Sequence, residues 1–154
     1  MLDLKKEWLE KVIAVLRCEL SMLTKALDDS SAAATDPGSK AEGKYDTRSL
    51  EMSYLAAGQA KQAEALTETL AQLERFEVTV FAITDAIALG AMVELEREGE
   101  WFWYFLLPAG GGVEVEGEER QFTTLTPESP LFSQLEGKRI GEGIESGGTV
   151  SEVT

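Results

Sequence analysis

Apolar side chains recur at alternating spacings of four and three residues along the first half of the chain. The first run consists of Leu9, Ile13, Leu16, Leu20, Leu23 and Leu27, and the second of Met52, Ala56, Gln59, Ala63, Leu66, Leu70 and Leu73. This spacing places each run on one side of an α-helix and predicts two helices, over about residues 4–27 and 40–75. The intervening segment 28–39 contains Pro37 and Gly38 and predicts a loop. We therefore expect an antiparallel coiled-coil hairpin over residues 1–76.

Other apolar residues lie beside these two runs. They are Trp8, Val12 and Val15 on the first helix and Leu50, Tyr54 and Leu55 on the second, and we expect all of them to widen the seam. The alanines in the middle of the second run are small and let the two helices approach closely. A helical pair within a larger bundle is the commoner use of such patterns, but no third helical pattern follows here.

The period changes after Phe76, where β-branched and aromatic residues gather in short runs. These runs predict strands over residues 92–97, 101–107, 113–115, 122–125 and 150–153, with reversals at 99–100 and 110–112. Alternate residues of the run WFWYFLL are expected to face a core, while one exposed aromatic pair remains open as a docking patch. The glycines at 110–112 favour a tight reversal over a phosphate loop, because neither a helix nor a nearby lysine follows. We expect an α+β protein with a small β domain over residues 77–154.

Charge narrows the range of partners. The chain has 154 residues, of which 28 are acidic and 14 basic, so its formal net charge is -14. The phosphate backbone of nucleic acid would be repelled by most of this surface, and we expect no stable direct binding to DNA or RNA. An acidic surface suits docking on a basic protein surface instead.

Several kinds of chemistry are excluded by residue type. The chain has no histidine, which excludes Ser-His-Asp, Cys-His and His-metal sites. Its one cysteine, Cys18, cannot form an internal disulfide and is expected to be a small, partly buried side chain of the first helix. The N-terminus is charged every few residues, and the weakly charged run 78–93 is shorter than a membrane span. We therefore expect a cytoplasmic protein that does not enter membranes.

The segment 129–142 reads SPLFSQLEGKRIGE and carries the most specific motif of the chain. Together with the preceding hairpin, it resembles the signature of the bacterial Gre transcription elongation factors, in which SP and L are followed by GK and a further glycine. Residues 87–95 (IALGAMVEL) and 41–45 (AEGKY) also resemble segments of that family. The resemblance covers nearly the whole chain and is that of a divergent paralogue.

The resemblance implies a C-terminal domain with an FKBP-like fold of antiparallel strands that docks on the rim of the secondary channel of RNA polymerase. The residues that it assigns to this contact are Ser129, Pro130, Leu131, Gly137 and Lys138, with Pro130 and Leu131 in a loop. RNA polymerase is thus the expected partner, and the protein is expected to act as a monomer. It would not be an enzyme alone, and it would need no cofactor of its own.

The resemblance also implies that the hairpin tip reaches toward the polymerase active site. There, Asp36 and Glu42 would be the catalytic carboxylates, with Asp46 as a substitute, and would help to hold a magnesium ion shared with the polymerase. In an ungapped alignment on Tyr45, Glu42 falls one position from the family's glutamate and Gly38 takes the place of its aspartate. A small insertion would restore both matches. The alternative reading is that Asp36 turns the loop and Glu42 favours the positive end of the second helix.

Three other functions remain open at this stage. A factor of the same shape can occupy the channel as an inhibitor that does not support cleavage. An FKBP-like domain suggests a peptidyl-prolyl isomerase or a chaperone-like adaptor, although a fold alone does not give that activity. A self-associating coiled coil would instead form a dimer whose melting depends on concentration.

Overall fold

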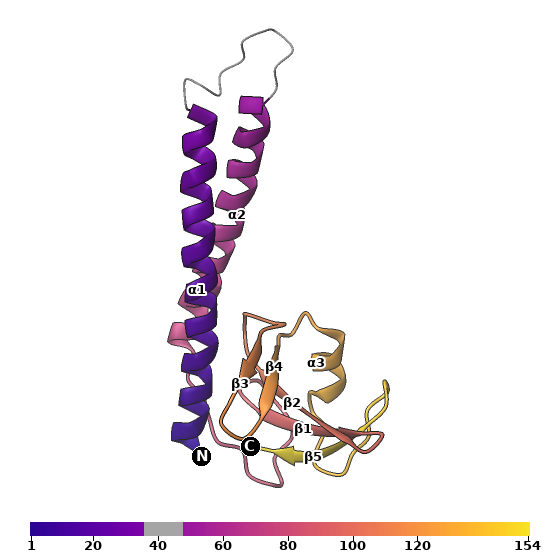
Figure 1. Cartoon of the computed structure of the whole chain (residues 1–154). Coiled ribbons are helices and arrows are strands. Elements are labelled where there is room, and N and C mark those ends of the chain that lie inside the picture. The colour runs from indigo at the N-terminus through magenta and orange to yellow at the C-terminus, as the bar shows by residue number, and fades with distance from the viewer. Residues whose placement is uncertain (36–47) are drawn as a thin grey trace. The chain divides into compact units, whose positions relative to one another are not determined.

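The computed structural model describes residues 1–35 and 48–154 (Figure 1). Two helices, α1 (Leu2–Thr35) and α2 (Arg48–Arg75), come first. They are followed by strands β1 (Met92–Arg97), β2 (Glu100–Leu106), β3 (Glu114–Glu116) and β4 (Gln121–Leu125), a short helix α3 (Pro130–Leu135) and strand β5 (Thr149–Val153). The expected α+β class, with a helical pair ahead of a sheet, is confirmed. None of the described helices is both long enough and apolar enough to span a membrane.

Contacts group the chain into two units. The hairpin unit is Leu16–Thr69, and the sheet unit combines Met1–Val15 with Leu70–Thr154. The boundary expected near residue 76 follows the change from helix to strand. The contacts instead assign the beginning of α1 and the end of α2 to the same unit as the sheet.

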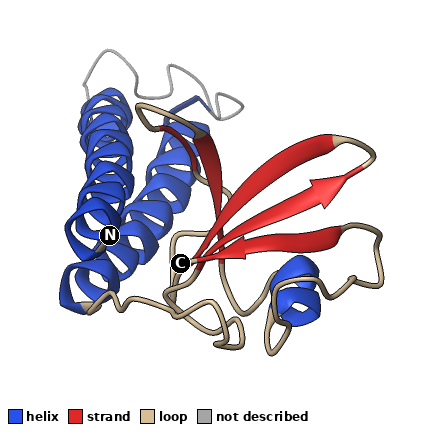
Figure 2. Cartoon of the chain, turned by 90° about the horizontal axis from the view of Figure 1, so that it is seen from below, coloured by secondary structure: helices blue, strands red, loops and turns tan. Residues whose placement is uncertain are grey.

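The two helices of the hairpin unit lie side by side and antiparallel (Figures 1 and 2). The side chains partly buried along their seam are Leu20, Leu23 and Leu27 of α1 and Met52, Ala56, Gln59, Ala63 and Leu66 of α2. These are the positions that the spacing predicts. The expectation that Leu50, Tyr54 and Leu55 join the seam is wrong, because all three are exposed.

Helix α1 continues to Thr35, eight residues past the end that the apolar spacing predicts. Residues 28–35 contain three consecutive alanines and neither glycine nor proline, so nothing in them breaks a helix. The first strong stop is Pro37. The prediction of a loop from residue 28 is therefore wrong for residues 28–35, which are helical.

The five strands form one sheet in the order β3-β4-β2-β1-β5. β1 and β2 form an antiparallel hairpin, and its two-residue turn at Glu98 and Gly99 has φ angles of 54° and 82°, as such turns require. β2 and β4 are parallel, so the expectation of a purely antiparallel sheet is wrong. β3 lies two positions from β2 in the sheet, and β4 occupies the position between them. The FKBP-like description stays a prediction.

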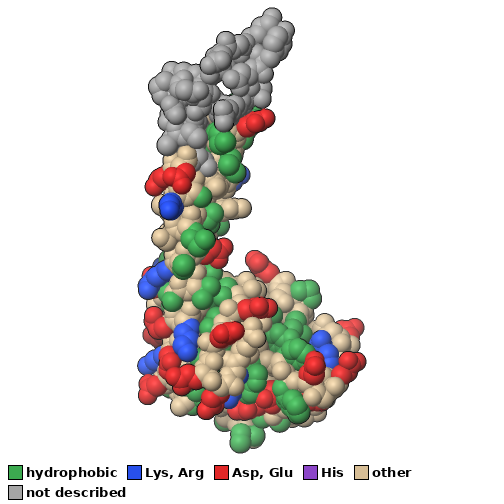
Figure 3. Space-filling view, in the orientation of Figure 1, with side chains coloured by type: hydrophobic (Ala, Val, Ile, Leu, Met, Phe, Trp, Pro, Cys, Tyr) green, Lys and Arg blue, Asp and Glu red, His purple; other side chains and the backbone are tan. Residues whose placement is uncertain are grey.

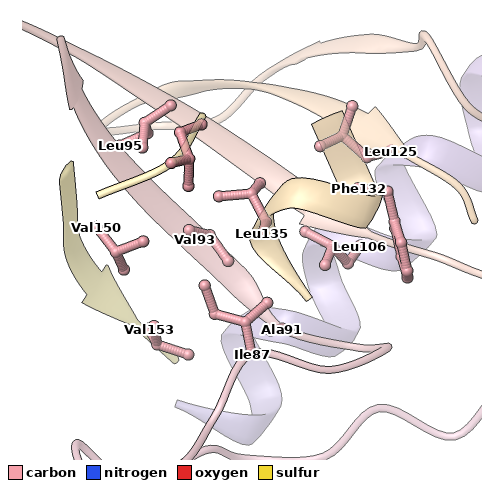
Figure 4. Close-up of a cluster of buried hydrophobic side chains, with 11 residues drawn as sticks. Ile87, Ala91, Val93, Leu95, Leu106, Leu125, Phe132, Leu135, Val150 and Val153 are labelled. Carbon is pink, nitrogen blue, oxygen red and sulfur yellow. The ribbon is translucent and has the colours of Figure 1, made fainter. Parts of the chain in front are cut away.

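The two faces of the sheet pack differently. Residues directly paired across strands share a face, and neighbours along a strand point to opposite faces. On one face, α3 contributes Phe132 and Leu135 to a cluster whose other members are Ile87, Ala91, Val93, Leu95, Leu106, Leu125, Ile144, Val150 and Val153 (Figure 4). On the opposite face, Trp8 of α1 packs against Phe105 and Phe122, with ring centroids 6.4 and 6.0 Å from that of Trp8.

Candidate functional site

The signature segment folds as α3 and the turn that follows it. Ser129 is the residue before the helix and has an extended backbone without a side-chain capping hydrogen bond, and Pro130 occupies the first turn, where its missing N–H costs nothing. Gly137 ends the helix with a φ of 81°, which favours glycine. Its N–H donates to the carbonyl of Ile87, and the N–H of Ile87 donates to the carbonyl of Lys138, both at 2.8 Å. The motif therefore specifies a short helix whose terminal turn is hydrogen-bonded to Ile87, in the segment before β1.

The structure brings the five residues assigned to the polymerase contact together at this helix. Pro130 and Gly137 are exposed, whereas Ser129, Leu131 and Lys138 are partly buried. Leu131 packs against the apolar cluster beneath α3. The expectation of a loop with an exposed Pro130-Leu131 pair is therefore wrong, because the segment is helical and Leu131 points partly inward.

The outer side of α3 offers a shallow polar depression of about 330 Å³, lined by Ser133, Gln134, Glu136, Lys138 and Glu145. The side-chain oxygen of Gln134 accepts the N–H of Ser146 at 2.8 Å, which ties the helix to the turn before β5. Next to it, the guanidinium of Arg139 donates to the carbonyl of Thr84. This surface mixes both signs of charge and is suited to contact with a polar protein surface.

The acidic tip cannot be placed from the structure. Asp36, Glu42 and Asp46 lie outside the described residues, so their predicted catalytic and magnesium-binding roles stay predictions. Asp28 and Asp29, which precede them on α1, are exposed. Within residues 1–35 and 48–154, no group of three or more acidic or cysteine side chains is arranged to hold a metal ion. Cys18, expected to be partly buried, is exposed.

Two residues of α1 that the sequence analysis did not single out as functional attach this helix to the rest of the sheet unit. Lys5 is 0% exposed, and its ammonium donates to the main-chain oxygens of Thr79 at 2.6 Å and Thr154 at 2.7 Å. The same ammonium lies 4.8 Å from the ring centroid of Phe81. Burial lowers the pKa of Lys5 from 10.5 to about 8. The signal was present in the sequence, because Lys5 lies one helical turn before Leu9 on the apolar side.

Trp8 is the second of these residues. Its indole is also 5.7 Å from the guanidinium of Arg120, which stacks at 3.7 Å on the ring of Trp103. Arg120 thus bridges two indoles, one from α1 and one from β2. Such cation–π contacts strengthen the attachment of the first turns of α1 to the sheet.

The aromatic run of β2 opens onto a cleft of about 480 Å³. Its lining consists of Trp101, Phe102, Trp103, Tyr104, Glu114, Arg120, Gln121 and Thr123. Trp101 and Phe102 are both exposed. A docking patch in this run would need such an exposed aromatic pair. As neighbours along a strand, however, they point to opposite faces of the sheet.

No protein-family model and no curated protein matches the sequence. Among solved structures, GreA factor homologue 1 (Gfh1) of Thermus thermophilus is 22% identical with a TM-score of 0.37, and the match covers 96% of this chain and 93% of that one. Gfh1 of Thermus aquaticus is 21% identical with a TM-score of 0.37, over 99% of this chain and 96% of the other. A further structure of the transcription factor Gfh1 is 22% identical with a TM-score of 0.34, over 91% and 89%. This chain is thus similar, over nearly its whole length, to homologues of the Gre factors, the family that residues 129–142 resemble.

Proposed function

We propose that this protein binds RNA polymerase and modulates transcription elongation by placing its helical hairpin in the secondary channel. The observation that carries the proposal is the segment 129–142, whose resemblance to the Gre signature coincides with one structural element, α3 and its terminal turn. An antiparallel helical pair precedes the sheet, as a channel-inserting factor requires. The protein alone has no enzymatic activity in this proposal.

The docking surface that we propose is the outer side of α3. Pro130 and Gly137 are exposed there, and Lys138 lies at the edge of the depression beside Ser133 and Glu136. Leu131 supports this surface from beneath by packing on the core. Because the chain has a net charge of -14, its approach to a basic polymerase surface would be steered by charge and would weaken at high salt.

The tip carboxylates supply the second half of the proposal. Carboxylate oxygens are preferred ligands of Mg²⁺, and a polymerase that holds one ion can bind a second with help from another protein. Asp36 and Glu42 are proposed for this role, with Asp46 as a substitute. If they act in this way, the factor stimulates cleavage of backtracked RNA; if they do not, it occupies the channel as an inhibitor.

Binding is tested with purified bacterial RNA polymerase and the labelled full-length chain. We expect a complex that a known secondary-channel factor displaces, and that the double variant Pro130→Ser with Lys138→Ala weakens. Lys6→Ala is the matched control, because Lys6 is an exposed lysine of the sheet unit far along the sequence from α3. Absence of binding at low salt would refute the proposal, and equal binding by the double variant would place the contact elsewhere.

Cleavage is tested separately with stalled elongation complexes. The variant Asp36→Asn with Glu42→Gln keeps side-chain size and removes charge, so we expect it to bind polymerase normally and to stimulate no cleavage. If the unaltered protein itself stimulates no cleavage across a range of magnesium concentrations, the inhibitor version of the proposal replaces the cleavage version.

One observation favours the isomerase or chaperone-like alternative, namely the aromatic lining of the cleft beside β2. Against it, Glu114, Gln121 and the stacked Arg120 make this cleft polar on one side. The space between α3 and the sheet is filled, because Phe132 and Leu135 are buried there. A proline-isomerisation assay decides the matter, and acceleration that Trp101→Ala abolishes would support the alternative.

A further inference from the structure

The sheet face opposite α3 becomes open toward the β1–β2 turn. Trp8 covers Phe105 and Phe122 at one end of this face, whereas Trp103 is partly buried and Trp101 is 61% exposed. The burial of the residues that share this face of β2 therefore falls steadily from Phe105 to Trp101. The indole of Trp101 is the largest apolar group that this end of the face presents to solvent.

Three carboxylates share the sheet face of the exposed indole. Glu96 is paired directly across from Trp101, and Glu94 directly across from Trp103, so both share the face of the two indoles. Glu152 of β5 is in turn paired with Glu94. We call Trp101, Glu94, Glu96 and Glu152 the acidic tryptophan surface. Figure 3 shows how closely acidic and hydrophobic side chains are interspersed on the sheet unit.

Two carboxylates of this surface, Glu94 and Glu96, are held in place by hydrogen bonds. One oxygen of Glu94 accepts the hydroxyl of Ser151 at 2.7 Å, and one oxygen of Glu96 accepts the N–H of Gly99 at 2.8 Å. Within the described part of the chain, no lysine or arginine forms an ion pair with Glu94, Glu96 or Glu152. Three like charges that lie close together favour the approach of a cation.

The neighbouring indole shows how such a cation can bind. The guanidinium of Arg120 lies 3.7 Å from the ring centroid of Trp103, on the same sheet face. A guanidinium is planar and weakly hydrated, so it stacks on an indole and still donates to carboxylates at its edge. Trp101, the next indole along this face, is exposed and has carboxylates beside it.

We propose that the acidic tryptophan surface binds a basic segment of a partner protein, with an arginine side chain stacked on Trp101 and paired with the carboxylates. The occupant is fixed by charge complementarity. Nucleic acid and anionic lipid would be repelled by Glu94, Glu96 and Glu152, and a purely apolar partner would bury these charges without compensation. The surface lies on the sheet face opposite α3 and shares no residue with the proposed polymerase contact, so it goes beyond the function proposed above.

The test uses the full-length chain and a short fluorescent peptide in which arginines alternate with glycine and serine. A second peptide carries glutamine in place of each arginine. We expect the arginine peptide to bind more tightly by anisotropy, and its affinity to fall with rising salt. Trp101→Ala should weaken this binding about two- to fivefold, as loss of one cation–π contact at an exposed site implies. Glu94→Gln with Glu96→Gln should weaken it as well, because the amides keep both acceptors but remove the charge.

Matched controls separate this surface from the general negative charge of the chain. Tyr54→Ala removes another exposed aromatic side chain, and Glu68→Gln removes another exposed carboxylate, both on α2. Neither should change the affinity, and circular dichroism should show that every variant keeps its fold. The proposal is overturned if both peptides bind equally, if Trp101→Ala binds as tightly as the unaltered chain, or if the controls lose as much affinity.

Discussion

The attachment of α1 to the sheet depends on Trp8, so we expect its replacement by alanine to be strongly destabilising. Trp8 is only 4% exposed although it belongs to a helix at the N-terminus of the chain. Its ring meets Phe105 edge to face, with an interplanar angle of 76°, and also contacts Phe122 and the guanidinium of Arg120. Trp8→Ala removes all three contacts and leaves a void beside the sheet.

The size of the effect follows from this burial. Truncation of a buried aromatic side chain to alanine typically costs about 3–5 kcal/mol of unfolding free energy, which includes the cavity that remains. Each aromatic pair adds about 0.5–1.5 kcal/mol beyond the buried area. We therefore expect a loss of about 4 kcal/mol, which is a large fraction of the roughly 5–15 kcal/mol by which small proteins are stable. The melting temperature should fall by roughly 10 °C.

Trp101→Ala is the control, because it is the same substitution at a position that is 61% exposed. Away from buried features, surface substitutions change stability by only about 0.5 kcal/mol. Urea unfolding is followed by circular dichroism, and hydrogen exchange of the β4 amides reports on the sheet unit specifically. If Trp8→Ala costs less than about 1.5 kcal/mol, or no more than Trp101→Ala, then Trp8 is not packed on the sheet as described.

Three further predictions concern single side chains. The pKa of Lys5 falls from 10.5 to about 8 on folding, so the unfolded chain binds more protons than the folded chain between these pH values. The free energy of unfolding should therefore rise with pH, by about 2 kcal/mol from pH 7.5 to 9.5. Urea unfolding should show this slope, and Lys5→Met should remove it. Gln59→Leu should raise the melting temperature of the hairpin unit by the equivalent of about 1 kcal/mol, because the side-chain oxygen of Gln59 is buried and has no hydrogen-bond partner among residues 1–35 and 48–154, whereas Gln62→Leu, at an exposed position, should give no such gain. Leu70→Asp should cost about 3 kcal/mol or more in denaturant unfolding because Leu70 is buried, and a comparable loss for the exposed Leu50→Asp would show that burial is not the cause.

The helical hairpin could be predicted because its signal is local and repeated. Positions such as Leu23 and Leu66 recur with the period of the seam over many turns, and all of the seam positions are buried or partly buried. Leu50, Tyr54 and Leu55 show the limit of this inference. They are apolar but lie off the seam, and an apolar side chain on a thin helical pair can remain exposed because there is too little interior to cover it.

The short helix α3 could not be separated from a loop on sequence alone. It has six residues, too few for a helical period to be visible, and Ser129-Pro130 begins a turn as readily as a helix. What decides between the two is the core beneath. Phe132 and Leu135 both reach the apolar cluster only if the segment is helical, since that conformation brings residues three apart to one side.

The attachment of the first turns of α1 to the sheet unit could not be predicted, because the groups that Lys5 contacts are far away in sequence and no side-chain pattern marks them. The two groups that accept hydrogen bonds from Lys5 are main-chain oxygens 74 and 149 residues away. Every residue has a main-chain oxygen, so no side-chain pattern at Thr79 or Thr154 marks it as the partner of a lysine. The parallel pairing of β4 with β2 could not be predicted either, because it depends on β3 taking the outermost position of the sheet, beyond β4. The local signal that does exist is a lysine on the apolar side of a helix. Because a buried ammonium must be compensated, that lysine indicates acceptors supplied by the rest of the fold, although it does not say which ones.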